Sequence, residues 1–569
     1  MSPAAPRVAV IGGGLAGITA AIALAEAGAA VTLLEARPRL GGATCSFSRD
    51  GLTVDTGQHI FLGCCTAYRD LLGKLGMTEH APIQDRFDVS VLAPGAIPRR
   101  GRLRRTALPG PLHMLPALGR YPFLSLAERT SVARPALAMR FVDPARPGVD
   151  EQRFGDWLAA RGQSERARRA LWDLFTVSAL NIAGDDASLS LAAVVVKTGL
   201  LGKKNAADIG VPALPLGELH GDAGATLLTS LGAQVLLNAK VSAIEPGAIE
   251  PGNGQEARFR VRLARAEDDA ALPAEIPADA VVLAVPHEAA ARLIPPGALP
   301  DATVAGWAGL GASPIVNVHV IYDRPVMDQP FAAAIDSPVQ WVFDRTRISG
   351  LDRRTQPGER DAPGGAASGP QYLAISLSAA DEYVDVPAAA LREQFIPALA
   401  ELFPAAREAQ VTEFFVTRER RATFRQAPGT ARLRPAAATN LPGLALAGAW
   451  TATGWPDTME SAVRSGLAAA IELRRTVLSV PGHSPSGHPG AGHSASGHSA
   501  SGHPDAGHPD AGHSASGHPD AGHPDAGHSA SGYPDAGHSA SGYPGTGYSD
   551  SVLSGSEANA TTSTIGERQ

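Results

Sequence analysis

The fold of this chain follows from a stretch near its beginning, Arg7-Val-Ala-Val-Ile-Gly-Gly-Gly-Leu-Ala-Gly17. Residues 8–11 are typical of a short buried strand, and the alanine-rich residues 18–27 are typical of a helix. Three glycines between them have the spacing G-x-G-x-x-G: Gly12, Gly14 and Gly17. This spacing suits a tight turn, close approach of the backbone to a pyrophosphate, and close helix–sheet packing. The helix N-terminus offers unpaired N–H groups to phosphates, so Leu15 and Ala16 are also candidate binding residues.

A second strand with an acidic residue at its end follows this motif. Residues 30–34 form the predicted strand, and Glu35 ends it. A carboxylate at this place can accept hydrogen bonds from a ribose hydroxyl pair and would repel a 2′-phosphate. The order strand, turn, helix, strand and acid is more specific than the glycines alone. It predicts a dinucleotide-binding α/β fold; the alternative is a glycine-rich core turn without a ligand.

The residues after Glu35 indicate which dinucleotide binds. The spacing from Glu35 to Gly41-Gly42 resembles the E-x-x-x-x-x-G-G extension of the flavin-dependent amine oxidase and phytoene desaturase superfamily. That resemblance implies FAD, with backbone of the second glycine pair close to the diphosphate. A basic side chain usually follows the pair, but this chain has Ala43, so Arg37 or Arg39 supplies that contact or it is missing. The resemblance places these residues at FAD: Glu35, Ala36, Arg39, Gly41, Gly42 and Ala43.

The composition predicts a large globular body. The 569 residues are 44% hydrophobic, which allows an extensive core and several domains. The three cysteines, Cys45, Cys64 and Cys65, are odd in number and lack a metal-site or C-x-x-C pattern. We therefore expect no disulfide framework, and a reducing, cytoplasmic compartment.

The charge is unevenly distributed. From residue 481 onward there are eight acidic residues and one basic residue, which accounts for the whole formal charge of −7. The remainder holds 48 residues of each sign and is neutral, so the sequence gives no case for nucleic-acid binding.

The C-terminal residues 481–569 differ in kind from the body. Five-residue units such as Gly-His-Ser-Ala-Ser and Gly-His-Pro-Asp-Ala repeat from residue 481 to about residue 548. A segment so poor in aliphatic residues cannot offset the entropy of ordering, and we predict a disordered tail. Its eleven regularly spaced histidines suit loose binding of Zn²⁺, Ni²⁺ or Cu²⁺. The alternative is a tolerated product of replication slippage, and no catalytic metal is expected.

A second motif follows the glycine-rich segment, Asp55-Thr-Gly57-Gln58-His59. Together with Cys64-Cys-Thr-Ala-Tyr68, it resembles the hydroxysqualene dehydroxylase family, also described as squalene-associated FAD-dependent desaturases. The resemblance implies that Gly57 and Gln58 lie beside the flavin. It also makes His59 the candidate general acid, with Asp55 or Gln58 as its orienting residue. The alternative is that these are hydrogen-bonded core residues without a catalytic role.

A third motif lies near the end of the body, in residues 444–466. Its first part is a predicted strand that reaches Gly448, and residues 459–473 are predicted to be helical. The resemblance implies that this strand end meets the ribityl chain and that the helix N-terminus faces the flavin N1–C2=O edge. It places Gly448, Ala449, Thr458 and Met459 at the cofactor, and Val241 beside the adenine. The superfamily commonly has Gly-Asp where this chain has Gly448-Ala449, which puts one hydrogen bond in doubt.

These patterns predict a Rossmann-like FAD-binding domain interleaved with an α+β substrate domain, followed by the disordered tail. The FAD-binding domain is expected at residues 1–75, 216–300 and 411–480, and the substrate domain at 76–215 and 301–410. Residues 233–245 are predicted to form one strand. The basic run 99–105, beside the proline-broken apolar residues 108–118, is ordinarily a solvated face. Its alternative is peripheral contact with anionic lipid headgroups at the inner face of the membrane.

The resemblance implies reductive removal of the allylic hydroxyl of hydroxysqualene, giving squalene for hopanoid synthesis. The substrate would be a long apolar isoprenoid. Two other enzyme classes are open, a carotenoid-type desaturase and an amine oxidase. A non-catalytic, flavin-bound scaffold that presents its histidine-rich tail is the alternative outside enzymes.

Overall fold

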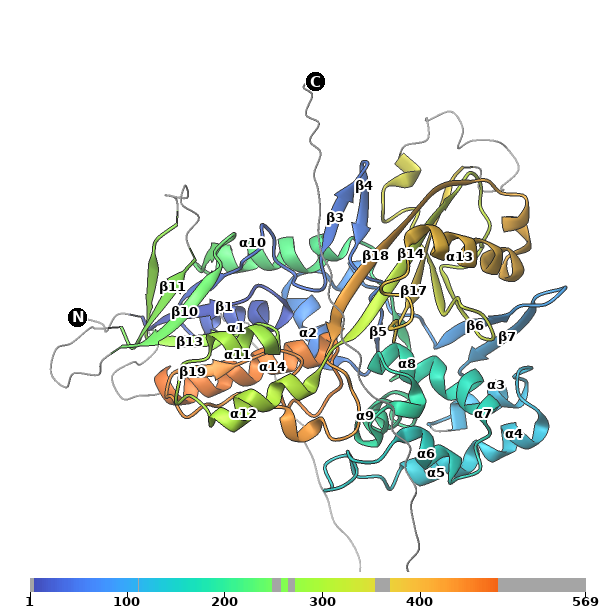
Figure 1. The fold of residues 1–569 in the computed structure, drawn as a ribbon, viewed down its shortest axis with the longest axis horizontal. Helices are drawn as coiled ribbons and strands as arrows, with labels where there is room; N and C mark the ends of the chain where they lie inside the picture. The colour runs from blue at the N-terminus through green and yellow to red at the C-terminus, as the bar shows by residue number, and fades with distance from the viewer. Residues whose placement is uncertain (1–4, 111, 248–256, 265–271, 354–368, 479–569) are drawn as a thin grey trace, which may run out of the picture. The chain divides into compact units, whose positions relative to one another are not determined.

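The computed structural model describes residues 5–110, 112–247, 257–264, 272–353 and 369–478 (Figure 1). The described residues all belong to one compact unit. The predicted disordered tail, residues 481–569, lies outside the described residues.

Strands from the beginning, the middle and the end of the body build a parallel sheet of five strands. Their order is β19 (Leu444–Leu446), β13 (Ala280–Leu283), β1 (Arg7–Ile11), β2 (Ala30–Leu34) and β9 (Gln234–Leu236), and every neighbouring pair is parallel. Helices α1 (Leu15–Glu26), α10 (Ala223–Ser230) and α14 (Met459–Leu473) lie along this sheet (Figure 1). A Cβ atom on Gly466 of α14 would lie 2.3 Å from the carbonyl oxygen of Ala16, so a glycine is needed for α14 to approach α1 this closely. The predicted Rossmann-like fold is confirmed.

A second, larger sheet carries seven strands. In order they are β18 (Val411–Thr423), β14 (Ser313–Tyr322), β17 (Gln371–Leu377), β16 (Trp341–Asp344), β15 (Phe331–Ala334), β6 (Asp88–Ala93) and β7 (Arg99–Arg104). One face packs against α13 (Ala388–Leu402) through β14 residues such as Val316 and Val318. Because side chains alternate along a strand, Asn317 and His319 lie on the opposite face.

Short helices, two of which continue as π-helical turns, form a lobe below this sheet in the view of Figure 1. They are α3 (Leu115–Gly119), α4 (Leu126–Ser131), α5 (Ala133–Met139), α6 (Phe154–Ala159), α7 (Glu165–Ala167), α8 (Asp173–Leu180) and α9 (Leu189–Val195). Phe154 and Trp172 pack edge to face in its core, 6.0 Å between ring centroids. Among the described residues, no helix is long and apolar enough to cross a membrane.

A hairpin joins the two sheets. It consists of β3 (Ser46–Arg49) and β4 (Leu52–Asp55), and Leu52 and Val54 pack with Ile321, Tyr372 and Phe415 of the larger sheet. The hairpin therefore delivers the residues after Asp55 to the place where the two sheets meet.

Two sequence expectations differ from the structure. Residues 233–245 form two strands, β9 and β10 (Val241–Pro246), in separate sheets. Asn238 between them has a φ of 56°, the left-handed conformation that asparagine adopts more readily than most residues, and it turns the chain. The expected domain boundary at residue 411 falls at the start of β18, and this strand belongs to the seven-stranded sheet as far as Thr423.

Candidate functional site

The glycine loop after β1 has the geometry that its spacing predicts. Gly12 has a φ of 107°, and a Cβ there would lie 2.3 Å from the carbonyl oxygen of Ala284. A Cβ on Gly17 would lie 1.8 Å from the carbonyl oxygen of Gly12. Gly14 caps α1, yet a Cβ on it would meet nothing closer than 3.8 Å. Packing within the protein thus explains Gly12 and Gly17, whereas Gly14 leaves space in front of the helix N-terminus, where Leu15 and Ala16 begin α1.

Glu35 lies directly beside this loop. One carboxylate oxygen accepts a hydrogen bond from the N–H of Gly13 at 2.7 Å, and the other accepts from the N–H of Arg37 at 2.8 Å. The side chain is buried because the loop folds over it. Each oxygen retains a lone pair, which a hydroxyl donor can use. Ala36, which follows, is exposed.

The second glycine pair packs on the first loop. The N–H of Gly41 donates to the carbonyl oxygen of Gly13 at 2.8 Å, and a Cβ on Gly42 would lie 2.9 Å from the Cα of Gly14. Nearby, the buried Nε of Arg39 has no hydrogen-bond partner within the described part of the chain. Arg37 is exposed, so Arg39 is the better candidate for an anion contact. Ala43 contributes a carbonyl, which accepts from Thr56 Oγ1 at 2.7 Å.

The loop after β19 is held by a buried arginine. The guanidinium of Arg434 donates to the carbonyl oxygens of Thr451 at 2.6 Å and of Ala449 at 3.0 Å. Burial lowers the pKa of Arg434 to about 10. Gly448 has a φ of 139°, and its N–H donates to Ser465 Oγ at 2.8 Å. Arg434 thereby holds the loop that carries Gly448 and Ala449. The sequence motif predicted those two residues for the site but did not include Arg434.

Thr458 caps α14, and Met459 is the first residue of that helix. The next residue, Glu460, is buried and accepts from the N–H groups of Ala67 and Tyr68 at 3.2 and 2.8 Å. It therefore caps the start of α2 (Thr66–Lys74), where the side chain of Cys65, the residue before the helix, does not cap the described N–H groups. This contact ties the third motif to the second.

Val241, the expected adenine neighbour, begins β10 and is buried. Two residues before it, the N–H of Ala239 donates to the backbone carbonyl oxygen of Glu35 at 2.8 Å. Val241 thus lies near the acid that the sequence assigns to the ribose.

The structure gives Asp55 a different set of partners from the expected one. Its carboxylate forms a buried ion pair with Arg345 and accepts from Ser46 Oγ at 2.6 Å and from the N–H of Leu216 at 3.0 Å. It makes no hydrogen bond to His59 among the described residues. Asp55 anchors the end of the hairpin, and its charge reaches His59 only through space.

His59 and Gln58 follow this anchor. His59 Nδ1 lies 3.2 Å from the carbonyl oxygen of Gly57, and because a carbonyl only accepts, Nδ1 carries the hydrogen. Burial lowers the pKa of His59 below its ordinary value of 6.5. Gln58 Oε1 and Asn317 Oδ1 are both buried without a partner in the described regions. Asn317 Nδ2 donates to the carbonyl oxygen of Thr56 at 3.3 Å, which brings β14 to this segment.

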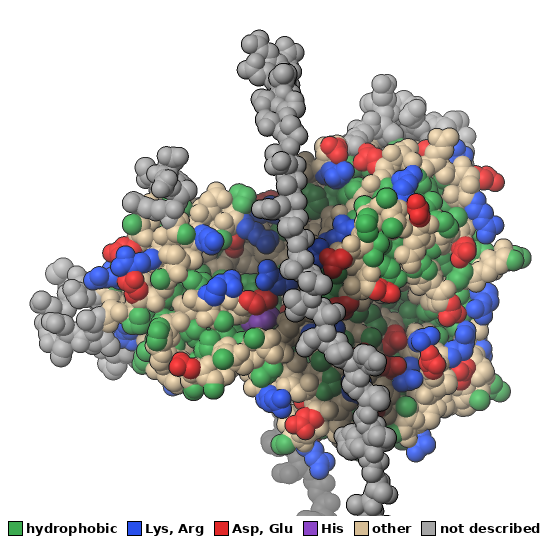
Figure 2. Space-filling view, viewed as in Figure 1, with side chains coloured by type: hydrophobic (Ala, Val, Ile, Leu, Met, Phe, Trp, Pro, Cys, Tyr) green, Lys and Arg blue, Asp and Glu red, His purple; other side chains and the backbone are tan. Residues whose placement is uncertain are grey.

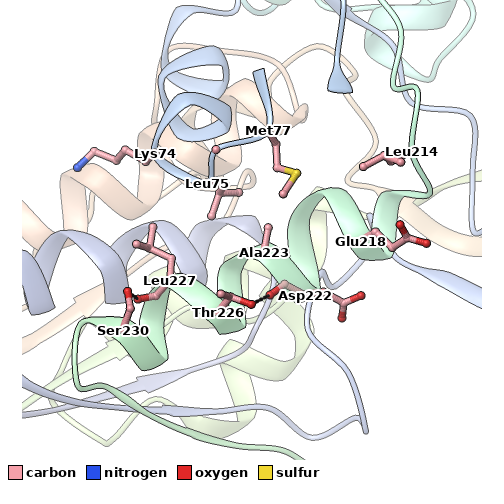
Figure 3. Close-up of a pocket in the computed structure, with 11 residues that line it drawn as sticks. Lys74, Leu75, Met77, Leu214, Glu218, Asp222, Ala223, Thr226, Leu227 and Ser230 are labelled. Carbon is pink, nitrogen blue, oxygen red and sulfur yellow. Dashed lines mark hydrogen bonds between the residues drawn. The ribbon is translucent and has the colours of Figure 1, made fainter. Parts of the chain in front are cut away.

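An open pocket of about 520 Å³ lies elsewhere, between the end of α2 and α10 (Figure 3). Leu75 and Met77 face Ala223 and Leu227 across it, with Lys74 at one end. None of the candidate site residues lines it, and we assign it no part in the reaction.

A known protein family matches almost the whole of the body that carries these residues. The flavin containing amine oxidoreductase family matches residues 15–473. The chain belongs to that family. It is therefore a flavin-dependent oxidoreductase, and FAD is its cofactor.

Several curated proteins resemble this family member over most of their length. Hydroxysqualene dehydroxylases of Sinorhizobium fredii and Rhodopseudomonas palustris are each 28% identical to it, covering 82% and 81% of this chain and 97% of theirs. Zeta-carotene desaturase of Arabidopsis thaliana is 24% identical, covering 82% of this chain and 84% of its own. A putrescine oxidase structure superposes with a TM-score of 0.59 at 20% identity, covering 83% of this chain and 99% of its own. The last likeness concerns the fold alone.

The site of this flavoprotein fits FAD. The space before Gly14, the unpartnered Nε of Arg39 and the lone pairs of Glu35 suit a diphosphate and a ribose. A buried donor without a partner is costly, so an anion beside Arg39 would remove that cost. The helix N-termini behind Gly14 and Thr458 add favourable dipoles.

Proposed function

We propose that this flavoenzyme removes the hydroxyl of hydroxysqualene reductively, releasing squalene and water. The likeness to hydroxysqualene dehydroxylases, which covers 97% of their length, carries the proposal. The substrate would be a long apolar isoprenoid, and the product would enter hopanoid synthesis. A cytoplasmic protein at the inner face of the membrane suits such a substrate.

Reduced FAD would supply the hydride when bound. The chain itself must protonate the departing oxygen, since hydroxide is a poor leaving group. With Nδ1–H held by the carbonyl of Gly57, His59 would hold the transferable proton at Nε2. Gly57, rather than Asp55, is then the orienting group.

Two unpartnered acceptors favour a hydroxylated substrate. Gln58 Oε1 and Asn317 Oδ1 are buried, and a buried acceptor without a donor is costly. An alcohol, or the water that it becomes, can donate to them. A carotene hydrocarbon has no such donor. Carotenoid desaturation remains the second candidate because of the zeta-carotene desaturase relatives, and amine oxidation is a third possibility within the family.

The direction of electron flow separates these candidates. Enzyme reduced anaerobically and mixed with hydroxysqualene should return to the oxidised yellow spectrum and release one squalene per FAD. Reduction of the oxidised enzyme by a carotene precursor or an amine, with no reaction of the reduced enzyme with hydroxysqualene, would overturn the proposal. Asn317→Ala should slow the reaction more than Asn317→Asp, which keeps an acceptor.

A further inference from the structure

One region of the chain collects most of the exposed apolar surface. Of the nine large hydrophobic side chains that are exposed among the described residues, seven lie between residues 97 and 141. They are Ile97, Leu108, Leu112, Leu115, Leu126, Leu137 and Phe141. The side chain of Leu126 is 74% exposed and that of Phe141 is 83% exposed. A soluble surface seldom exposes so many large apolar side chains close together in the sequence.

These side chains belong to elements that touch one another. Helix α3 contacts β7 and α4, and α4 contacts α5. On α5 and its end, Arg134, Leu137 and Phe141 share one face, because they are three and four residues apart. We call the exposed side chains of residues 97–141 the basic apolar surface.

The same region is strongly basic, although the body as a whole is neutral. Residues 97–142 contain nine arginines and one acidic residue, Glu128. Arg100, Arg120, Arg134 and Arg140 are exposed and have no ion-pair partner within the described part of the chain. On the face drawn in Figure 2, basic and apolar side chains occur together where Figure 1 places α3 and α4.

We propose that the basic apolar surface docks on a lipid bilayer that contains anionic headgroups, with Leu126, Leu137 and Phe141 entering the interface. Apolar side chains among arginines are the pattern of helices that lie in the plane of a membrane. Leucine and phenylalanine gain by leaving water, and arginine gains beside lipid phosphate. The docking is independent of the substrate: it requires only the lipid surface.

Vesicle co-sedimentation of the full-length holoprotein tests this. The protein should bind mixed vesicles that contain equal amounts of phosphatidylcholine and phosphatidylglycerol. It should bind vesicles of phosphatidylcholine alone much more weakly. Because each arginine near an anionic surface contributes about fivefold to binding, Arg134→Gln with Arg140→Gln should weaken the binding by about 25-fold. Leu137→Gln with Phe141→Gln should weaken it by more than about tenfold on both vesicles.

Two control variants make the same chemical changes elsewhere. Leu467→Gln with Ile471→Gln alters the other exposed apolar pair, four residues apart on α14. Arg420→Gln with Arg421→Gln removes two exposed arginines from β18. Both should bind vesicles as the unaltered protein does. The substituted residues of both test pairs and of the apolar control are exposed, so these variants should fold normally. The FAD absorption spectrum of each variant checks its fold.

The proposal fails if the unaltered protein does not bind anionic vesicles, or if test and control variants weaken binding equally. It also fails if the test variants bind vesicles normally but convert a dimer to a monomer, since the surface would then join two copies of this chain. Binding is measured without turnover, so its failure leaves the proposed dehydroxylation standing, and failure of dehydroxylation leaves the docking standing.

Discussion

Asp55 and Arg345 form a buried ion pair although 290 residues separate them in the sequence. Their side chains are 3% and 9% exposed, so water screens the pair little. Asp55 ends the hairpin that leads to Gly57 and His59, and Arg345 follows β16 of the larger sheet. The pair therefore fixes the candidate catalytic segment against the sheet that carries Asn317.

Arg345→Met should lower the free energy of unfolding by about 3–5 kcal/mol, because it leaves the Asp55 carboxylate buried without its counter-charge. Urea denaturation measures this. Arg347→Met, at an exposed position two residues later, is the matched control and should change little. Combining Arg345→Met with Asp55→Asn should cost less than the sum of the two single changes. Strict additivity would show that the pair does not act as a unit.

Glu35→Ala should weaken FAD binding by about ten- to a hundredfold, since hydrogen bonds to a charged acceptor contribute about 1.5–3 kcal/mol. The ratio of FAD to purified protein and a fluorescence titration of the apoprotein measure it. Glu26→Ala removes an exposed glutamate paired with Lys74 and should leave FAD binding unchanged. Full FAD occupancy with unaltered affinity in Glu35→Ala would remove Glu35 from the site.

Reoxidation of the reduced enzyme by hydroxysqualene should accelerate as the pH falls. Burial places the pKa of His59 below 6.5, so near neutral pH little of it is protonated, and a general acid acts in its protonated form. The rate should rise about tenfold per pH unit down to that pKa and then level off. His59→Ala should remove this dependence and slow the step by roughly 10²–10⁴-fold while FAD stays bound. Unchanged pH dependence in His59→Ala would mean that another group, or ordered water, gives the proton.

The folded protein should lose stability in acid through two buried histidines. Burial lowers the pKa of His220 and of His319 to about 3, whereas both should titrate near 6.5 when unfolded. Between these values the unfolded chain binds more protons, so stability falls as the pH falls, by about 1.4 kcal/mol per pH unit for each histidine.

His319→Leu should remove about half of that slope between pH 6 and pH 4. The exposed His80 offers the control, because His80→Leu should leave the slope as it is. His319 donates or accepts hydrogen bonds with Tyr372 and Thr417, so its loss also lowers stability at neutral pH. The slope, rather than the stability at one pH, is the quantity to compare.

Truncation after residue 480 should leave FAD content and turnover unchanged, because we expect a segment so poor in aliphatic residues to contribute little to the fold. It should abolish retention on immobilised nickel, since all eleven regularly spaced histidines lie in the removed segment. A large loss of turnover would show that the tail acts in catalysis or folding. Nickel retention that survives truncation would place the metal-binding histidines in the body.

The geometry of the glycine loop was predictable because its determinants are local. Gly12 is required by its φ of 107°, Gly17 is required by its contact with the carbonyl oxygen of Gly12, and Glu35 ends a strand that pairs directly with β1. Such steric requirements leave a fixed spacing in the sequence. The limits of β2 and α14 were predicted correctly for the same reason, since strand length and helix capping depend on adjacent residues.

The tertiary structure alone decided which distant groups meet. Arg345, Asn317 and Arg434 belong to no motif that the sequence shows. Sheet pairing and the packing of the β3–β4 hairpin bring Arg345 to Asp55 and Asn317 to Thr56. By itself, the sequence determined the Rossmann-like fold and the geometry of the glycine loop, because backbone sterics act over short distances. The partners of Asp55 depend on long-range packing, which no local pattern records.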